Sequence, residues 1–391
     1  MRIFLHDYGG YAFTLQLAKA WAKRGHTVYY AFSATTQYVK RAEEGDKVNG
    51  LTYRGINLLK PFQKYSFYRR YQSEVEHGHA VAREIHDFQP DIVISANTPL
   101  DAQSLIFRSC KDISAKFVFW FQDAISIATQ RVLHKKFFLV GDLIGKHYQT
   151  LEKSLLRSSD KVILIAEDFQ LLMNKWRVDP HKITVIPNWM PLEEIAPQVK
   201  QNPWSLEHDL ADKFCFIYTG ILGLKHDPEL FIHLARQFCP NDNVRVVVVS
   251  QGEKAEELKS KANANNLTNL IIMPFQSNEV YSQVLGSADV LVSILNVDAG
   301  IYSVPSKVLT YFCAGRSMLL SVPVENAAAR VVMQAKAGLV SSPDDVELFL
   351  KNARILYTDQ AKRLEMGQNA RNYAEKEFDI ENILSQFHLV L

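Results

Sequence analysis

Short apolar runs alternate with stretches of helical periodicity in the first half of the chain. Over residues 11–24, Phe13, Leu17 and Trp21 recur at every fourth position, which places them on one face of a helix. The strands predicted in this half are Arg2–Leu5, Thr27–Phe32, Asp91–Ala96, Lys116–Phe121, Lys161–Ile165 and Ile183–Ile186. Strand, glycine turn, helix and strand form the first βαβ unit of a doubly wound parallel sheet.

The same pattern starts again near residue 214. The run Val244–Ser250 is nearly all valine, which is typical of a strand buried on both faces of a parallel sheet. A glycine turn at Thr219–Gly223 and a helix at Pro228–Phe238 precede it. The other elements predicted here are strands at Phe214–Tyr218, Leu270–Met273, Ala288–Leu295 and Met318–Val322, and helices at Val346–Tyr357, Gln360–Lys376 and Ile380–Leu389. We therefore predict an α/β protein of two Rossmann-like domains that face each other across a cleft.

Three prolines among polar residues mark Met190–Leu206 as the linker between the two halves. We place the domains at residues 1–195 and 196–372, and we expect residues 373–391 to form a helix that packs back on the first domain. A chain of 391 residues, 47% hydrophobic and 22% charged, is long enough to bury two such cores.

Composition excludes some classes of function. A formal net charge of +2 does not supply the basic field that nucleic-acid binding requires. The four cysteines show no CxxC spacing, which indicates a reducing compartment and no structural zinc. No signal-peptide pattern opens the sequence, and no apolar run approaches the roughly 18 residues of a membrane-spanning helix. We expect a cytoplasmic enzyme.

The stretch Asn296–Arg316 carries the first chemical signal. It follows a predicted buried strand and ends in a short helix that Gly315 closes. Pro305 suits the first position of that helix, so the amides of Ser306 and Lys307 would lie at its N-terminus, where backbone dipoles favour an anion. The lysine adds a positive charge. The pattern predicts a diphosphate cradle, and an ordinary strand-to-helix turn is the alternative.

Glycines and polar residues follow three strands of the first half. Gly9 and Gly10 follow the first strand, Asn97 and Thr98 follow the strand at 91–96, and Asp123 follows the strand at 116–121. Because open α/β sheets bind ligands beyond the carboxyl ends of their strands, we expect these residues to lie near a substrate. The alternatives are that the glycines serve only the geometry of a turn and that Asp123 caps the next helix.

The stretch Leu58–Gln72 interleaves aromatic and basic residues. Such a stretch suits an anionic membrane surface or a phosphorylated, lipid-linked substrate. A surface helix with partly buried aromatic rings is the alternative. We therefore expect either a peripheral contact with the inner face of a membrane or no membrane contact at all.

The order and separation of four segments resemble the retaining glycosyltransferases of the two-Rossmann (GT-B) type, most closely family 4 and its polysaccharide-assembly members. The segments are Lys182–Trp189, Tyr218–Glu229, Ser303–Lys307 and Ala314–Arg316. The resemblance covers nearly the whole chain. It implies a nucleoside-diphosphate sugar as donor, first of all UDP-glucose, bound mainly by the second domain.

The resemblance also assigns residues. Lys225 matches the family's phosphate lysine and Gly220 the glycine beside it, whereas Ile221 stands where the family usually has arginine; Lys307 is expected to compensate. The family's two glutamates align with Tyr302 and Thr310, so weaker nucleotide binding is implied. Further donor positions are Gly9, Gly10, Phe275, Gln276, Ser303 and Ser306, and the acceptor or sugar positions are Asn97, Thr98, Asp123, Asn188 and Asp298.

For the mechanism, the resemblance implies front-side attack in which the leaving phosphate takes the acceptor proton, with no cofactor and no metal. Lys225 and Lys307 would stabilise the charge on the leaving diphosphate, and Asp123 is the third residue assigned to catalysis. The acceptor would be a saccharide or a lipid-linked saccharide of exopolysaccharide or cell-envelope glycan biosynthesis. Two alternatives stay open, a nucleotide-sugar-binding protein without activity and a UDP-sugar 2-epimerase on the same architecture.

Overall fold

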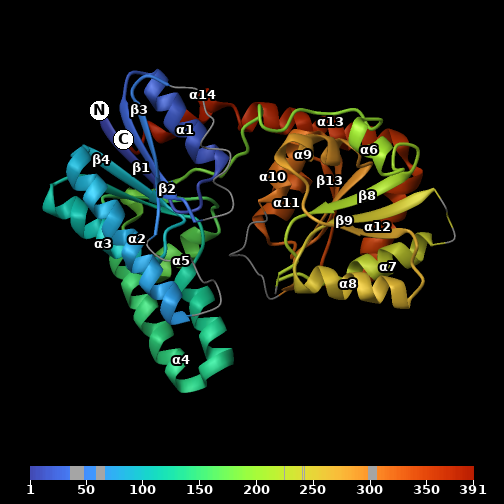
Figure 1. The fold of residues 1–391 in the computed structure, drawn as a ribbon, viewed down its shortest axis with the longest axis horizontal. Helices are drawn as coiled ribbons and strands as arrows, with labels where there is room; N and C mark the ends of the chain where they lie inside the picture. Colours follow the sequence, from blue (N-terminus) through green and yellow to red (C-terminus); the bar gives the residue numbers. More distant parts are fainter. Residues whose placement is uncertain (36–47, 59–66, 224, 240, 242, 298–305) are drawn as a thin grey trace. The chain divides into compact units, whose positions relative to one another are not determined.

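The computed structural model of the protein describes residues 1–35, 48–58, 67–223, 225–239, 241, 243–297 and 306–391 (Figure 1); within its helices, the side chains of residues 67–68 and 135–138 are not described. The chain divides into two compact units. Unit 1 consists of Met1–Asn188 together with Ile380–Leu391, and unit 2 consists of Trp189–Asp379. Each unit is a doubly wound parallel α/β structure, as the sequence predicted.

Unit 1 contains a seven-stranded parallel sheet in the order β3-β2-β1-β4-β5-β6-β7. The chain leaves β1 toward β2 on one side and later adds β4 on the other, so the switch point of the sheet lies between β1 and β4. The strands are β1 (Arg2–Asp7), β2 (Thr27–Ser33), β3 (Leu51–Ile56), β4 (Ile92–Ala96), β5 (Lys116–Phe121), β6 (Lys161–Leu164) and β7 (Ile183–Val185). The helices are α1 (Ala12–Lys23), α2 (Phe67–Phe88), α3 (Leu100–Asp112), α4 (Ile125–Ser158), α5 (Phe169–Lys175) and α14 (Ile380–Phe387).

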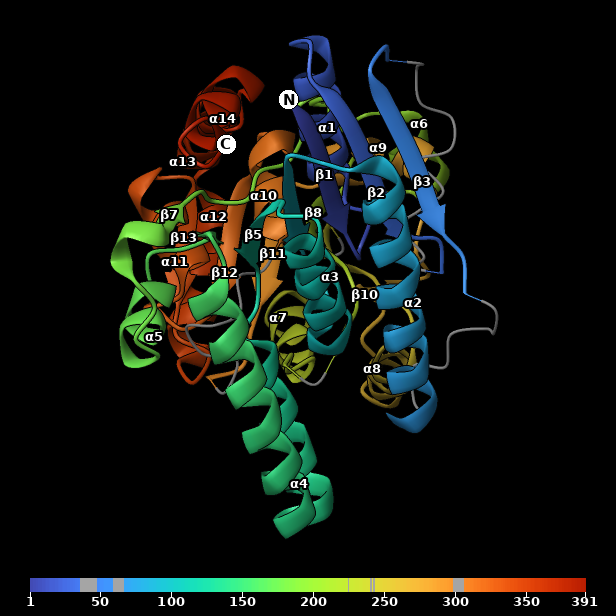
Figure 2. The same cartoon turned by 90° about the vertical axis from the view of Figure 1, so that its left-hand side faces the viewer.

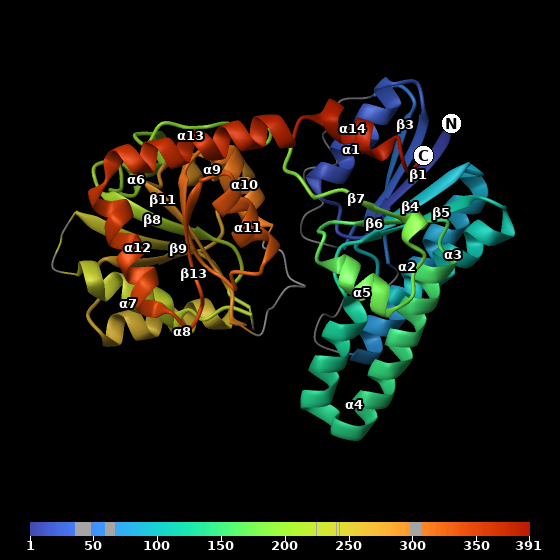
Figure 3. The same ribbon diagram turned by 180° about the vertical axis from the view of Figure 1, so that it is seen from behind.

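Strand β5 shows how both faces of this sheet are covered. Phe117 packs against Phe107 of α3 with ring centroids 5.4 Å apart, and Trp120 packs against Phe387 of α14 at 5.0 Å. Side chains three positions apart on a strand point to opposite faces, so α3 and α14 cover opposite sides. Figure 3 shows α14 beside α1, which it contacts. The last helix therefore belongs to the core of unit 1, as predicted.

Helix α4 folds back on itself. A straight helix of 34 residues would be about 51 Å long, yet the backbone N–H of Ser126 donates to Glu152 at 3.2 Å and His134 pairs with Asp142 at 2.9 Å. A Cβ atom on Gly141 would collide with the carbonyl oxygen of Leu133, so the glycine allows the two arms to cross closely. The sequence did not predict this antiparallel helical hairpin, which extends beyond α2 and α3 in Figure 2.

Unit 2 contains a six-stranded parallel sheet in the order β10-β9-β8-β11-β12-β13, with its switch point between β8 and β11. The strands are β8 (Phe214–Thr219), β9 (Val244–Val249), β10 (Leu270–Met273), β11 (Val290–Ile294), β12 (Ser317–Ser321) and β13 (Gly338–Ser341). The helices are α6 (Pro203–Glu207), α7 (Glu229–Phe238), α8 (Glu253–Ala264), α9 (Asn278–Gly286), α10 (Lys307–Ala314), α11 (Ala327–Gln334), α12 (Val346–Thr358) and α13 (Gln360–Glu377).

Two local predictions in unit 2 need correction. The helix expected to start at Pro305 starts at Lys307, and Pro305 lies outside the described residues; Gly315 ends this helix in the left-handed conformation, as predicted. The stretch Met190–Leu206, predicted as the linker between the halves, falls within unit 2 and contains a helix, because Asn202 and Ser205 form a capping box that starts α6. Pro203 is the first residue of that helix rather than a break in the chain.

In the described part of the chain, no helix is both long enough and apolar enough to cross a membrane.

Candidate active site

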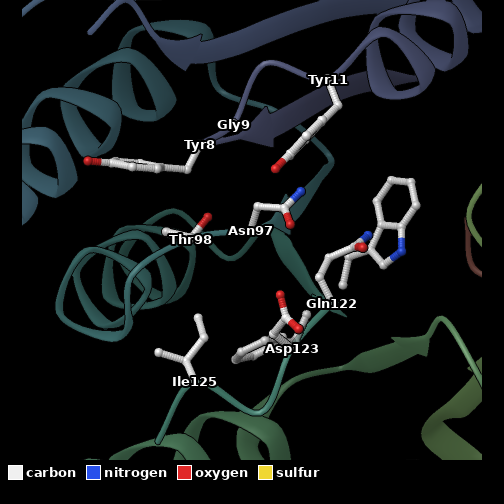
Figure 4. A pocket seen from close by; sticks show the side chains of 10 residues that line it. Tyr8, Gly9, Tyr11, Asn97, Thr98, Gln122, Asp123 and Ile125 are labelled. Carbon is white, nitrogen blue, oxygen red and sulfur yellow. The ribbon is translucent and has the colours of Figure 1, made fainter. Parts of the chain in front are cut away.

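A cavity of about 270 Å³ lies at the carboxyl ends of β1, β4 and β5 in unit 1, and we call it the strand-end pocket. Figure 4 shows the side chains of Asn97, Gln122 and Asp123 around its open space. Its position at the switch point of the sheet is where doubly wound folds bind ligands. The lining residues are Tyr8, Gly9, Tyr11, Asn97, Thr98, Phe119, Trp120, Gln122, Asp123 and Ile125.

A buried carboxylate organises one wall of this pocket. Asp7, the last residue of β1, accepts hydrogen bonds from the backbone N–H groups of Gly9 (3.1 Å) and Tyr11 (2.7 Å) and from the hydroxyl of Thr14 (2.6 Å). It also accepts from the side-chain amide of Asn97 at 2.9 Å. Burial raises the pKa of Asp7, and these four donors act in the opposite direction. One side chain thus fixes both the glycine loop and Asn97.

The two glycines of this loop are needed for different reasons. A Cβ atom on Gly9 would collide with the ring of Tyr11, which lines the pocket. Gly10 has a φ of 65°, in the left-handed region that favours glycine. The loop therefore brings backbone close to the pocket, as the donor assignment of this pair requires.

Asn97 and Thr98 both follow β4, but they differ in how far their side chains are exposed to the pocket. Asn97 has a positive φ of 54° and is half-buried, with its side chain lining the pocket. Thr98 is buried, and its hydroxyl lies 2.9 Å from the carbonyl oxygen of Ala96 and 3.0 Å from Nδ1 of His6. Asn97 is the better placed of the two to contact a sugar.

Gln122 and Asp123 follow β5 at the opposite wall. The amide groups of Gln122 and Asn188 hydrogen-bond to each other in both directions, at 3.1 and 2.5 Å, which brings the predicted Asn188 to the pocket's edge. Asp123 is exposed and lines the pocket. The alternative that it caps α4 is not observed, because the N-cap residue is Ala124 and no side chain caps it there.

A pair of histidines lies behind the pocket. Nε2 of His6 and Nε2 of His77 are 2.9 Å apart, so one ring must donate and the other must accept. Burial lowers the pKa of both, that of His77 to about 4, and both rings are neutral at physiological pH. Tyr8 packs its ring edge-on against His77, and burial raises the pKa of Tyr8 to about 12. Tyr8, which lines the pocket, therefore carries a phenol that stays protonated and rests on a neutral histidine.

The second group of predicted residues gathers at the switch point of unit 2, which we call the lysine cradle. Lys307, the first residue of α10, places its ammonium 3.2 Å from the hydroxyl of Tyr218 and 4.6 Å above that ring. Gly220 follows β8 with a φ of 131°, and a Cβ atom there would lie 3.1 Å from Cε of Lys307. Burial, followed by the charge of Lys225, lowers the pKa of Lys307 to about 8.

Lys225 follows β8 in the same unit, and its charge contributes to the lowered pKa of Lys307. The backbone carbonyl of Lys225 accepts from the N–H of Asn296, which ties the loop after β8 to the end of β11. His226 accepts from the N–H of Gly223 at 3.0 Å, and burial, then the charge of Lys307, lowers its pKa to about 4. Lys307 thus begins α10 beside the loop after β8, which carries a second cation and a neutral imidazole, and such an arrangement suits a diphosphate.

The remaining residues predicted to bind the sugar donor differ in solvent exposure. Ser306, the N-cap residue of α10, is exposed, whereas Thr310 in the same helix is buried. Phe275 is exposed after β10, and the side chain of Gln276 accepts from the indole N–H of Trp204 at 3.0 Å. Tyr302, Ser303 and Asp298 lie outside the described residues.

Gln122 lies at a polar strand end that the sequence placed near a substrate, but it was given no role. Asp7 and the lining residues Tyr8, Tyr11, Phe119, Trp120 and Ile125 were not assigned from the sequence. A polar residue at the end of an apolar strand was the available signal for Asp7. Within the described ranges, no three His, Cys, Asp or Glu side chains are grouped as metal ligands, and metal independence stays a prediction.

A lysine at a helix N-terminus beside the switch point, in one of two doubly wound units, is typical of a protein that binds a nucleoside diphosphate. Residues 9–194 match the family model of Glycosyltransferase Family 4, and residues 201–373 match that of Glycosyl transferases group 1. The chain therefore belongs to the GT4-type glycosyltransferases of the GT-B fold, as the sequence resemblance predicted.

The chain is 26% identical over 246 residues to the UDP-Gal:alpha-D-GlcNAc-diphosphoundecaprenol alpha-1,3-galactosyltransferase of Escherichia coli, and this match spans 60% of each protein. HepE (Alr3699) of Anabaena in complex with UDP-glucose superposes with a TM-score of 0.75 at 14% identity, covering 100% of this chain and 99% of that one. WaaG, a glycosyltransferase involved in lipopolysaccharide biosynthesis, superposes with a TM-score of 0.69 at 15% identity, covering 100% and 99%. At these identities the solved structures establish the fold alone.

Proposed function

We propose that the protein is a retaining hexosyltransferase that moves a sugar from a UDP-sugar to a saccharide or lipid-linked saccharide in glycan biosynthesis. The observation that carries the proposal is the lysine cradle at the switch point of unit 2, where Lys307 begins α10 and lies against Tyr218 and Gly220 of β8 and its loop. The charge of Lys225 contributes to the lowered pKa of Lys307. The positive charges of the two lysines repel each other, so the arrangement favours a ligand with two negative charges. The diphosphate of a nucleotide sugar has that charge.

In this proposal the lysine cradle binds the donor and the strand-end pocket binds the acceptor sugar. Lys225, Lys307 and the amides at the start of α10 stabilise the charge that grows on the departing diphosphate. Asn97 and Asp123 orient hydroxyl groups, and the phosphate oxygen takes the acceptor proton. Tyr302 and Thr310 replace the two glutamates of the family, which agrees with weaker binding of the nucleotide.

The choice of substrates rests on relatives. The galactosyltransferase of Escherichia coli is named for UDP-galactose and for an acceptor on diphosphoundecaprenol, and HepE was solved with UDP-glucose. Glucose is the first donor to test, with galactose beside it. The name of the E. coli galactosyltransferase supports a lipid-linked acceptor, and a second relative, the putative colanic acid biosynthesis glycosyl transferase WcaI, supports the proposed role in exopolysaccharide or cell-envelope biosynthesis.

The decisive experiment measures UDP, GDP and ADP release from a panel of nucleotide sugars, with and without EDTA and with an undecaprenyl-diphosphate-linked sugar as acceptor. We expect release from one UDP-sugar that EDTA does not reduce. Lys225→Ala and Lys307→Ala should each lower the rate by about 100- to 1000-fold, the usual loss for one transition-state donor. Lys259→Ala, a change at an exposed lysine of α8, should leave the rate unchanged.

Other outcomes contradict parts of the proposal. Tight UDP binding with no turnover of any donor would identify a binding protein without activity. Conversion of a UDP-sugar to its 2-epimer, without UDP release, would identify an epimerase. A product whose anomeric configuration, read by NMR, is inverted would contradict the retaining assignment.

A further inference from the structure

The α4 hairpin ends in an exposed apolar surface that the proposed reaction does not use. Leu139 and Leu143 are 75% and 72% exposed, and Val132, Val140 and Ile144 are also exposed. We call these five side chains the hairpin tip. Positions 139, 140, 143 and 144 are one helical turn apart in pairs, so they form one face of the second arm. Gly141 and Gly145 lie on the face that packs against the first arm.

This surface is not a consequence of poor packing nearby. Farther from the tip, hydrogen bonds join the two arms of the hairpin. Glu152 accepts from both the backbone N–H and the hydroxyl of Ser126, and the side-chain amide of Gln149 donates to that of Gln130. Leu133, on the first arm, is buried between them. The exposed side chains are therefore held outward by a formed structure. Clustered exposed apolar side chains of this kind mark an interaction site.

The charge around the hairpin is positive. The sequence of α4 contains six lysines and arginines but only two acidic residues, Asp142 and Glu152. Asp142 hydrogen-bonds to His134, and Glu152 is buried with a pKa raised to about 7, so the basic side chains of α4 outnumber its negative charges. Lys146 and His147 are exposed one turn from the tip. Apolar side chains beside basic groups suit a surface that is apolar inside and anionic outside.

The first turn of α2 extends this surface. Tyr148 of α4 donates to Asp101 at 2.7 Å, and Tyr71 lies near enough to add to the effects of burial and of that bond, which raise the pKa of Tyr148. Tyr71, Arg69 and Arg70 are exposed. Figures 1 and 2 both show this end of α2 on the side of unit 1 where the hairpin extends. The described part of the aromatic and basic stretch noted in the sequence thus lies beside the hairpin.

We propose that the hairpin tip inserts into the headgroup region of an anionic phospholipid bilayer, with Lys146 and Arg69 on the lipid phosphates; Arg70 pairs with Glu74 at 2.7 Å. The apolar face is short and comes from a turn between two arms, so it reaches into the interface and does not span it. The membrane, and not a second copy of the chain, is the occupant that the basic surroundings favour. Binding of this kind needs no turnover, so it stands or fails separately from the proposed reaction.

The test uses the full chain in vesicle flotation, with phosphatidylcholine alone or mixed with phosphatidylglycerol. We expect binding to the mixed vesicles that weakens with added salt. The double change Leu139→Gln and Leu143→Gln should weaken binding at least about tenfold, since each leucine contributes through burial. The matched control is Leu171→Gln, because Leu171 of α5 in the same unit is also 72% exposed and lies outside the hairpin tip. It should bind as the unchanged protein does.

A second measurement reports insertion directly. Cys239 is exposed and the other three cysteines are buried, so a polarity-sensitive fluorophore labels Cys239 alone in the unchanged protein. In a Cys239→Ser background, Leu143→Cys moves the label to the hairpin tip. Mixed vesicles should shift the emission of the tip label to the blue and leave the Cys239 label unchanged.

Three results would overturn the proposal. The first is no binding to the mixed vesicles, and the second is equal binding by the double variant and the unchanged protein. The third is a dimer, seen by light scattering, that the double variant converts to a monomer while vesicle binding stays the same. That result would assign the tip to contact with a second copy. Circular dichroism should show all variants folded, because the changed side chains are exposed.

Discussion

At the scale of single residues, Lys307 shows how a ligand site can oppose stability. Burial, together with the charge of Lys225, lowers its pKa to about 8, so its environment disfavours the ammonium until an anion arrives. We expect Lys307→Met to raise Tm by roughly 2–4 °C without ligand, equivalent to about 1 kcal/mol, and to remove most UDP affinity. Calorimetry with and without UDP measures both effects, and a lower Tm together with intact UDP binding would contradict this role.

The same pKa gives UDP binding a pH dependence with a definite sign. Lys307 loses its proton as the pH rises through about 8, so UDP affinity should fall above that value. Titration calorimetry between pH 7 and pH 9 should show the fall in the unchanged protein and not in Lys307→Met. Lys225→Met removes the neighbouring charge, so its weaker binding should fall only at a higher pH.

Asp7 is predicted to act as a positioning residue of the strand-end pocket. Asp7→Asn replaces one acceptor oxygen with a donor that faces other donors, so the glycine loop and Asn97 lose their shared anchor. We expect a loss of about 2–3 kcal/mol in the free energy of unfolding and an increase in KM for the acceptor that exceeds the change in KM for the donor. Thr14→Val, which removes one partner only, is the milder control. Equal changes in both KM values would argue for a purely structural role.

At the scale of elements, the sequence predicted the strands except β3 and β13, because most are continuous apolar runs, whereas of the α-helices it predicted only α1, α7, α10, α12, α13 and α14. The α4 hairpin was not predicted because the sequence pattern is helical through both arms and the bend. Only a tertiary contact shows that residues 126 and 152 lie together. Gly141 and Gly145 were the available signal. The start of α10 was predicted two residues early, since Pro305 fits a first turn but does not fix where hydrogen bonding begins.

Glu152 gives the hairpin a pH-dependent stability. Its pKa in the folded protein is raised to about 7 from a usual 4.5, so between these values the folded state binds more protons and stability falls as the pH rises. Glu152→Gln keeps an acceptor for Ser126 without the charge. We expect this variant to lose that part of the slope and to be more stable than the unchanged protein at pH 8 by about 1–3 kcal/mol. Urea unfolding at pH 5 and pH 8 measures the difference, and identical slopes in the two proteins would contradict it.

At the scale of the whole molecule, the repeated βαβ pattern predicted two doubly wound units. In each unit, the carboxyl ends of the parallel strands lie at one edge of the sheet, so predicted residues that are far apart in sequence gather near its switch point. Asn97, Asp123 and Asn188 meet in one unit, and Gly220 and Lys307 meet in the other. The polar partners that fix them could not be predicted, because Asp7 and the pair of His6 and His77 act through contacts between distant strands and helices. Spacing along the chain does not encode such contacts.

The last helix of the chain, α14, packs in the core of unit 1. Phe387 of α14 packs against Trp21 at 5.6 Å and against Trp120 at 5.0 Å, and Trp120 lines the strand-end pocket. Phe387→Ala should therefore destabilise unit 1 by about 3–5 kcal/mol and weaken acceptor binding. Unit 2 contains the lysine cradle, so UDP affinity should stay the same.

Calorimetry can separate the two units. If each unfolds in its own transition, Phe387→Ala should lower the Tm of one and leave the Tm that UDP raises unchanged. Leu389→Ala, at a position that is 69% exposed just beyond α14, is the matched control and should change neither transition. A loss of UDP affinity in Phe387→Ala would mean that α14 supports the donor site as well. The residue would then stabilise the protein as a single cooperative structure and not unit 1 alone.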